Sequence, residues 1–269
     1  VIEFHKKHGC GDISVFRSFR YNDEKQKLVG VAHPDPIRFS QLIGYKAQFD
    51  QLIDNTLAFL NGYNANNVLL VGSRGTGKSS SVKALVNEYH EQGLRLLEIT
   101  KEQIEKLPDI LKLFKTKRKK VLIFIDDLSF DEGEMGYKYM KSLLEGGSEG
   151  KPDNVLFYAT SNRRHIIQEK WSDRGTGISE DAEIHTTDTL NEKLSLADRF
   201  GITITFPKPT PKEYINIVKG LAAERNIELD EKTLQQQAMQ WEIRQKGMSG
   251  RTAKQFINNL MWNTQKEDK

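Results

Sequence analysis

The chain has 269 residues, of which 29% are charged, with a formal net charge of +3. Its mean hydropathy of −0.59 is typical of a soluble protein, and no apolar run approaches the roughly 18–20 residues of a membrane span. The single cysteine, Cys10, excludes an intramolecular disulfide and favours a reducing compartment, so we expect a cytoplasmic protein with no membrane partner. A net charge this small does not by itself indicate a nucleic-acid partner.

The N-terminal extension, residues 1–37, contains two short apolar runs, Ile13–Phe16 and Leu28–Val31. A polar stretch separates them, which predicts a β-hairpin. Two prolines, Pro34 and Pro36, then interrupt regular structure. A helical pattern follows, with apolar residues at Ala47, Phe49, Leu52, Ile53, Leu57 and Leu60.

The apolar run Val68–Val71 leads into Gly72-Ser73-Arg74-Gly75-Thr76-Gly77-Lys78-Ser79, which matches the phosphate-loop pattern in full. The glycines let successive backbone N–H groups point at a phosphate, and the helix that follows adds its positive N-terminal end. Lys78 is expected to reach the β- and γ-phosphates and Ser79 to bind Mg²⁺. The nucleotide-binding residues predicted here are Gly72, Ser73, Arg74, Gly75, Thr76, Gly77, Lys78, Ser79 and Ser80. The alternative is a glycine-rich turn without a ligand.

A predicted helix over Ser79–Glu91 and a strand over Leu94–Ile99 follow the loop. A capping box at Thr100 opens a further predicted helix that runs to about Phe114. The basic run Lys115–Lys120 closes it. This run is either a solvated turn whose cations complement the helix C-terminus or a patch for nucleic acid or an acidic partner.

Two aspartates follow the apolar run Val121–Ile125, which is typical of a strand covered on both faces. Ligands of such sheets bind beyond the carboxyl ends of the strands. Asp126 is therefore expected to hold Mg²⁺, and Asp127 to polarise an attacking water molecule. The alternative is that both residues merely begin a loop.

A helix over residues 135–144 and a strand over Val155–Ala159 are predicted next, the strand ending in Thr160-Ser161-Asn162. Asn162 is expected to orient water near the γ-phosphate, or else to cap the next helix. Residues 163–190 read as a long loop. A helix over 190–199 and a last strand, Ile202–Phe206, complete the α/β part.

Strand patterns stop after Pro207 and Pro209, and three helices are predicted instead. The first has a capping box from Thr210 to Glu213, and Ser249 caps the last. The sequence thus predicts an extension at 1–37, an α/β nucleotide-binding core at 38–208 and an all-helical lid at 209–269.

The ordered motifs resemble the AAA+ ATPase superfamily of P-loop NTPases over roughly residues 38–265. Within it, the chain is similar to an uncharacterised bacterial family with a replication-initiator or helicase-loader type of core. In this resemblance the phosphate loop is the Walker A motif and the end of the run at Asp126-Asp127 is the Walker B motif. Asn162 matches the first sensor, Arg199 the arginine finger and Arg251 the second sensor.

The resemblance implies a parallel five-stranded sheet of order 5-1-4-3-2 between helical layers, with a helical lid over ATP and Mg²⁺. Ile43 and Gly44 are similar to the segment whose backbone contacts adenine. The family pattern also implies a homo-oligomeric ring, with a hexamer as the candidate size, in which Arg199 acts in trans on a neighbour. Arg199 has a plainer reading as a cation at a helix C-terminus. Asp127 departs from the usual glutamate, which predicts slow hydrolysis.

The leading hypothesis is an ATP-hydrolysing AAA+ protein, an oligomeric remodelling or loading ATPase whose client is a protein or a nucleic acid. A nucleotide-dependent nucleic-acid-binding module is the first alternative, motivated by Lys112–Lys120 with Arg163 and Arg164. A P-loop small-molecule kinase is the second. GTP is disfavoured because no Asn-Lys-x-Asp element follows the paired aspartates.

Overall fold

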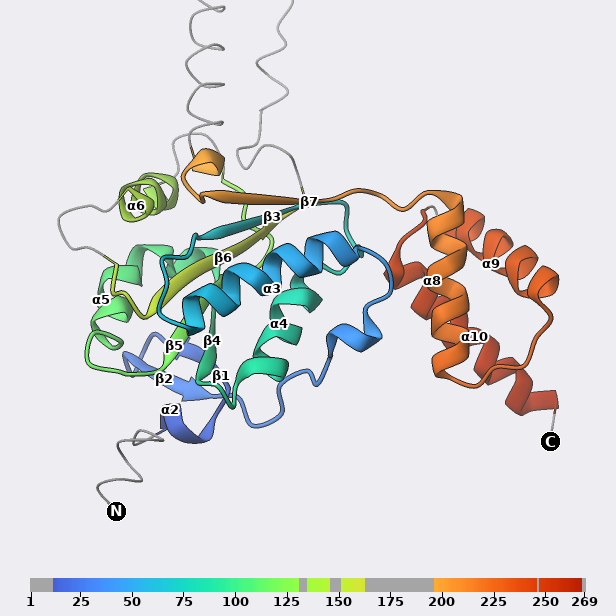
Figure 1. Cartoon of the computed structure of the whole chain (residues 1–269), viewed down its shortest axis with the longest axis horizontal. Coiled ribbons are helices and arrows are strands. Elements are labelled where there is room, and N and C mark those ends of the chain that lie inside the picture. The colour runs from blue at the N-terminus through green and yellow to red at the C-terminus, as the bar shows by residue number, and fades with distance from the viewer. Residues whose placement is uncertain (1–11, 131–134, 146–150, 163–195, 246, 268–269) are drawn as a thin grey trace, which may run out of the picture.

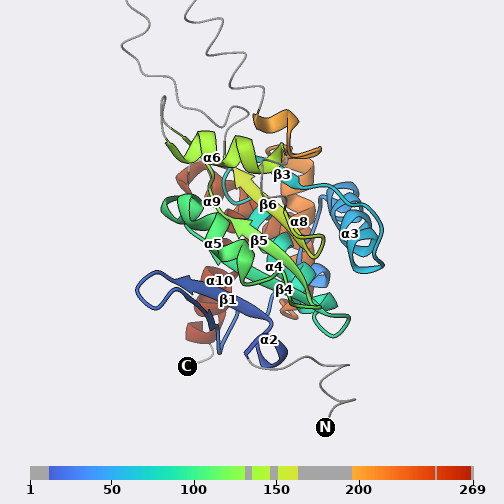
Figure 2. The same ribbon diagram turned by 90° about the vertical axis from the view of Figure 1, so that its left-hand side faces the viewer.

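A computed structural model of the chain describes residues 12–130, 135–145, 151–162, 196–245 and 247–267. A twisted β-sheet carries helices on both faces, and a group of three C-terminal helices, α8 to α10, lies beside one end of it (Figure 1). The view turned by 90° separates the layers, with α3 on one side of the strands and α5 and α6 on the other (Figure 2). The described residues therefore form a three-layer α/β unit with an added helical group.

The sheet has seven strands in the order β2-β1-β4-β5-β6-β3-β7. They are β1 (Ser18–Asn22), β2 (Lys27–Gly30), β3 (Val68–Gly72), β4 (Leu94–Ile99), β5 (Lys120–Ile125), β6 (Val155–Ser161) and β7 (Ile202–Phe206). Every neighbouring pair is parallel except the hairpin of β1 and β2. Parallel strands place their carboxyl ends along one edge, and this edge collects the polar residues described below.

The prediction of a sheet with five strands is wrong, because β1 and β2 extend it beyond β4. β1 joins β4 in parallel, with Ser18 opposite Leu96, and buries Phe19 in the core. The remaining five strands, numbered in chain order from β3, lie in the order 5-1-4-3-2. Residues 13–15, which were predicted to be in a strand, belong to helix α2 (Asp12–Val15). The first strand of the hairpin, β1, begins only at Ser18.

Apolar side chains that point alternately to the two faces of the sheet form two apolar clusters, one on each face. Leu69 and Val71 of β3 belong to the cluster under α5 and α6, whereas Val68 and Leu70 belong to the cluster under α3 and α4. Successive side chains of a strand point to opposite faces. A continuous apolar run is therefore required wherever helices cover both faces.

The helices of the α/β part are α3 (Lys46–Leu60), α4 (Lys78–Tyr89), α5 (Leu107–Lys112) and α6 (Met135–Leu144), with 3₁₀ turns at Phe39–Gln41 and Lys101–Lys106. The prediction of one continuous helix from Thr100 to Phe114 is wrong. The segment is divided into a 3₁₀ turn and α5, because Pro108 has no backbone N–H to continue the earlier hydrogen bonds.

The C-terminal helices are α8 (Pro211–Glu224), α9 (Glu231–Gln245) and α10 (Gly250–Glu267). The Thr210 side chain accepts a hydrogen bond from the Glu213 backbone at the start of α8, as the capping box predicts. A third apolar cluster, including Tyr214, Phe256 and Ile257, joins the three helices to one another. In the described part of the chain, no helix has both the length and the apolar character needed to cross a membrane.

Candidate nucleotide site

A cavity of about 670 Å³ lies at the carboxyl edge of the sheet, where α8 and α10 approach the loop after β3. Its walls include the loop residues Arg74 to Ser80, the aspartates at the end of β5, Asn162 after β6 and Arg251 of α10. These groups come from four distant parts of the sequence. The fold thus brings most of the predicted site residues into one cavity.

The predicted phosphate loop, residues 72–79, has the backbone that its glycines allow. Gly72, Gly75 and Gly77 all have positive φ angles, of 145°, 78° and 97°. A side chain at Gly72 is excluded, since a Cβ there would lie 2.0 Å from the backbone oxygen of Phe206. Gly77 is the N-cap of α4, so the unpaired amides of the first helical turn lie beside the cavity. Such a helix end binds anions.

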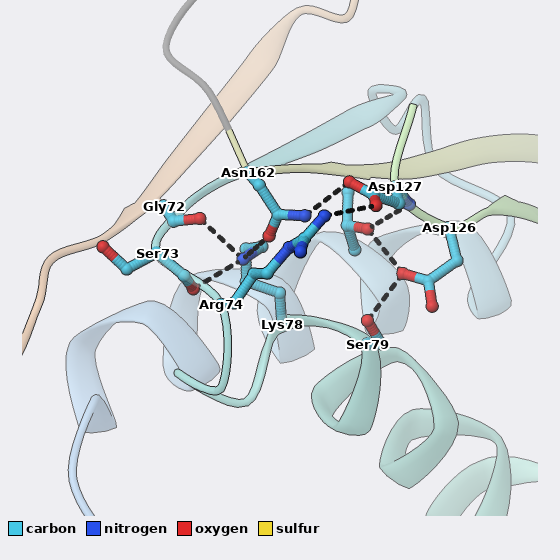
Figure 3. A network of polar contacts seen from close by, with 9 residues as sticks. Gly72, Ser73, Arg74, Lys78, Ser79, Asp126, Asp127 and Asn162 are labelled. Atoms are coloured by element: carbon cyan, nitrogen blue, oxygen red, sulfur yellow. Dashed lines mark hydrogen bonds and ion pairs between the residues drawn. The ribbon is translucent and has the colours of Figure 1, made fainter. Parts of the chain in front are cut away.

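Lys78 is almost fully buried, with 5% of its surface exposed. Its ammonium group donates hydrogen bonds to the backbone oxygens of Gly72 at 2.7 Å and Ser73 at 2.9 Å. A third bond of 3.1 Å reaches Oδ1 of Asn162 (Figure 3). Burial lowers the pKa of Lys78, and the nearby carboxylates of the aspartate pair oppose this shift. The lysine is held at the floor of the loop by three oxygen acceptors.

One carboxylate oxygen of Asp126 accepts hydrogen bonds from two hydroxyl groups. Ser79 Oγ and Thr160 Oγ1 each donate to Asp126 Oδ1 at 2.6 Å. A carboxylate with an adjacent serine hydroxyl supplies the oxygen ligands that Mg²⁺ prefers. The donor set therefore fits the magnesium role expected for Ser79 and Asp126. The sequence reasoning missed Thr160, although a polar residue at the end of a buried strand was a visible signal.

Asp127 has a left-handed backbone, with a φ angle of 54°. Its backbone N–H donates to Thr160 Oγ1 at 2.9 Å. Its carboxylate accepts a hydrogen bond from Asn162 Nδ2 and faces Arg74 Nη2 at 3.6 Å (Figure 3). Asn162 consequently joins Lys78 to Asp127, and the residues predicted to handle phosphate and water form one network.

One side of the cavity is apolar. Ile37, Leu42, Ile43 and Tyr45 face it from the segment before α3, and Ile217 and Leu221 face it from α8. Gly44, predicted beside Ile43, does not line the cavity, but it has a φ angle of 85° and lies against Ile217. This slot has the character expected for a planar base. Sequence reasoning identified Ile43 and missed the partners on α8, because nothing local indicates which helix closes the slot.

The C-terminal helices meet the phosphate loop directly. The backbone N–H of Arg251 donates to the Gly75 oxygen at 3.3 Å. A Cβ at Gly75 would lie 3.0 Å from Cβ of Arg251, so the contact depends on a glycine. Arg225 and Lys254 also line the cavity. Both were missed, although Lys254 lies three residues after Arg251 on the same helical face.

Arg199 lies apart from these groups. It forms an ion pair with Glu145 at the end of α6, and it is not among the residues that line the cavity. Gly72 and Ser73 also lie outside the lining, although both contact Lys78. The structure therefore does not bring Arg199 to the phosphate loop of its own chain. Arg163, Arg164 and the loop at 163–190 fall outside the described residues.

Comparison with solved structures shows which known proteins share this fold. Two variants of RuvB from Thermotoga maritima match at 15% and 14% sequence identity, each with a TM-score of 0.50. Each match covers 84% of this chain and 72% of the RuvB chain. At this identity the likeness concerns the fold alone. The chain has the α/β fold of these RuvB structures.

The family follows from the sequence match. Residues 14–264 match the family model described as "Protein of unknown function (DUF815)", and the chain belongs to this family. The search of curated proteins gave no match.

Proposed function

We propose that this protein binds ATP in the cavity and hydrolyses it with the help of Mg²⁺. The observation that supports this most strongly is the hydrogen-bonded network that joins Lys78, Asn162 and Asp127 beside the glycine-rich loop. Ser79 and Asp126 meet in the same network at 2.6 Å. Few other ligands require an anion-binding helix end, a buried lysine and an oxygen donor pair together.

The chemical roles follow from the charges. The amides at the start of α4 and the Lys78 ammonium hold the β- and γ-phosphates. Ser79 and Asp126 hold the magnesium ion, which when bound offsets phosphate charge. Asp127 and Asn162 orient the attacking water molecule. Asp127 is one methylene shorter than a glutamate, so we expect slow turnover.

We propose that residues 209–269 act as a lid on a core formed by residues 38–208, with 1–37 as an N-terminal extension whose strands β1 and β2 join the core sheet. The contact between Arg251 of α10 and Gly75 of the phosphate loop supports this. Through it, a movement of the three helices would move Arg251 relative to the loop. In this proposal Arg251 contacts the phosphates, and Ile43 and Gly44 approach the adenine.

We also propose that the protein acts as a homo-oligomeric ring, with a hexamer as the candidate size and with Arg199 serving a neighbouring subunit. The position of Arg199 outside its own cavity supports this role. Arginine fingers of this kind contribute about 10³–10⁵ in rate in related NTPases. A remodelling or loading activity, with a helicase-loader type of core, is the corresponding cellular role.

The ATP site is tested by Lys78→Ala, with Lys83→Ala on the same helix as a matched control. Lys83 does not line the cavity. We expect Lys78→Ala to abolish turnover and to weaken binding of Mg·ATP strongly, while Lys83→Ala behaves like the wild type. Unchanged ATP binding and turnover in Lys78→Ala would refute the assignment of the site.

The shared site is tested by the hydrolysis rate per subunit against protein concentration. A rate that climbs with concentration and collapses in Arg199→Ala supports a finger in trans. Glu145→Ala is the control, because it removes the partner of Arg199 and keeps the arginine itself. If Arg199 only stabilises its own chain through Glu145, the two variants lose the same activity, and the proposal of a shared site fails.

Nucleic-acid binding is a second candidate, supported by the basic turn between α5 and β5. Lys115, Lys117 and Arg118 are exposed there, at the amino end of β5, opposite the end that carries Asp126. Asn154 donates a 2.7 Å hydrogen bond to the Lys117 oxygen, which fixes the turn. Binding through phosphates should weaken steeply with salt. DNA binding that is absent or insensitive to salt would remove this candidate.

A further inference from the structure

The proposed ATP site uses Arg74 only through its backbone, as part of the phosphate loop, and assigns no role to its side chain. It extends from the loop toward Asp127, with Nη2 3.6 Å from Oδ2 (Figure 3). Both side chains are exposed, at 75% and 56%. Arg74 also lines the cavity. A positively charged side chain therefore lines the cavity proposed for the nucleotide.

The contacts form a chain from Arg74 to Asp127, from Asp127 to Asn162 and from Asn162 to Lys78. Arg74 and Lys78 are its two cationic ends, and the residue proposed to handle water lies between them. In this arrangement the carboxylate of Asp127 is occupied by a cation and an amide. It accepts a hydrogen bond from Asn162 Nδ2, and Arg74 Nη2 lies at ion-pair distance from it.

A phosphate would compete effectively for Arg74. An ion pair between exposed side chains contributes little, because water and salt screen the charges and both side chains lose freedom. A guanidinium group binds phosphate oxygens through two parallel N–H bonds, which is a stronger and more directional contact. We therefore expect that the free energy falls when Arg74 exchanges its contact with Asp127 for one with a phosphate.

We propose that Arg74 is a binding residue for the terminal phosphate of ATP, acting within its own chain, and that its transfer from Asp127 to this phosphate frees the Asp127 carboxylate to orient water. The inference rests on the proposed ATP site. It differs from the role of Arg199, which lies outside the cavity and pairs with Glu145.

The test compares two Mg²⁺-bound nucleotides that differ in the terminal phosphate, ADP and the non-hydrolysable β,γ-imido analogue of ATP. Binding is measured by calorimetry for the wild type and Arg74→Gln. We expect affinity for the analogue to fall by about 10- to 100-fold, as for loss of a charged hydrogen bond. Affinity for ADP should change by less than about threefold, because ADP lacks that phosphate.

Lys106→Gln is the matched control, since it also removes one cation from an exposed ion pair, with Asp23, away from the cavity. It should bind both nucleotides like the wild type. Equal losses for ADP and the analogue in Arg74→Gln would overturn the inference, as would no loss for either. If the wild type binds neither nucleotide, the proposed function itself fails, which is a separate result.

The exchange step is tested by repeating the comparison in an Asp127→Asn background. With no carboxylate to compete for Arg74, the loss of analogue affinity caused by Arg74→Gln should be larger there than in the wild type. The two substitutions are then coupled in a double-mutant cycle. Strictly additive effects would overturn the transfer from Asp127 to phosphate.

Discussion

The hydroxyl group of Thr160 donates a 2.6 Å hydrogen bond to Oδ1 of Asp126. The same hydroxyl accepts the backbone N–H of Asp127 at 2.9 Å. Thr160 is buried on β6, and it thus holds two successive residues at the end of the neighbouring strand β5. Because Asp127 adopts a left-handed φ angle of 54°, this hydroxyl is a local restraint on a backbone conformation that is unfavourable for a residue with a side chain.

Thr160→Val keeps the shape of the side chain and removes both hydrogen bonds. If Asp126 and Asp127 act as proposed, we expect kcat for ATP hydrolysis to fall roughly tenfold or more, since small misplacements of reacting groups are costly. Binding of ADP should change little, because the phosphate loop is intact. Steady-state kinetics and ADP titration measure the two effects.

Thr160→Ser keeps the hydroxyl and serves as the control for this position. It should recover most of the activity. If valine and serine variants are equally active, the hydroxyl does not position the aspartates.

Gly72→Ala should destabilise the protein by about 3 kcal/mol or more, because an added Cβ meets a backbone oxygen and the φ angle is unfavourable. The clash is with Phe206 of β7, at 2.0 Å. Gly62→Ala is the matched control, as Gly62 has a φ angle of 82° with nothing within 4 Å. It should cost only about 1–2 kcal/mol from backbone strain. Urea unfolding distinguishes them, and equal losses would contradict the predicted clash.

Tyr158→Phe should lower the free energy of unfolding by about 1–2 kcal/mol, the usual effect of a lost buried hydrogen bond. The buried Tyr158 hydroxyl contacts Thr56 Oγ1 at 2.8 Å and Asn55 Nδ2 at 3.0 Å, which ties β6 to α3. Nucleotide binding should not change, since Tyr158 lies opposite Val68, at the far end of β3 from the phosphate loop.

Tyr139→Phe removes a hydroxyl from a tyrosine that is 42% exposed, and it should leave the stability of the protein unchanged. Chemical denaturation of both variants makes the comparison. A Tyr158→Phe protein as stable as the Tyr139→Phe control would show that the buried network contributes nothing.

Lys151 should make stability depend on pH in mildly alkaline solution. Burial lowers its pKa to about 8 from an ordinary value of 10.5, and its ammonium group donates to the Val155 oxygen at 2.6 Å. Above about pH 8 the folded state releases this proton before the unfolded state does. The unfolded state then binds more protons, so the free energy of unfolding rises with pH.

The pH range in which Lys151 dominates ends near pH 10, where three tyrosines affect the free energy of unfolding in the opposite direction. Burial raises the pKa values of Tyr45, Tyr158 and Tyr214 to about 12. Lys151→Met should therefore reduce the slope of stability against pH between about pH 8 and 10. Lys232→Met, which removes an exposed lysine of α9, is the control. An unchanged slope in Lys151→Met would contradict the shift.

Several elements were predictable because their signals are local. The phosphate loop, the strand Leu94–Ile99 and the helix Met135–Leu144 each depend on consecutive residues or on a regular spacing within one segment. The edge of the sheet where Asp127 and Asn162 meet was also predictable, since parallel strands end together. The prediction of five strands failed because the hairpin was predicted as a separate extension, whereas β1 pairs with β2 and also with β4, which lies far from it in the sequence.

The sequence by itself determined the backbone of the proposed phosphate loop, because its glycines allow the positive φ angles found at residues 72, 75 and 77. Only the tertiary structure decided which side chains meet there. Thr160 reaches Asp126 because β6 lies beside β5, and the apolar slot closes because α8 packs against residues before α3. Such contacts join segments far apart in the chain, and they depend on strand register and packing that no local pattern specifies.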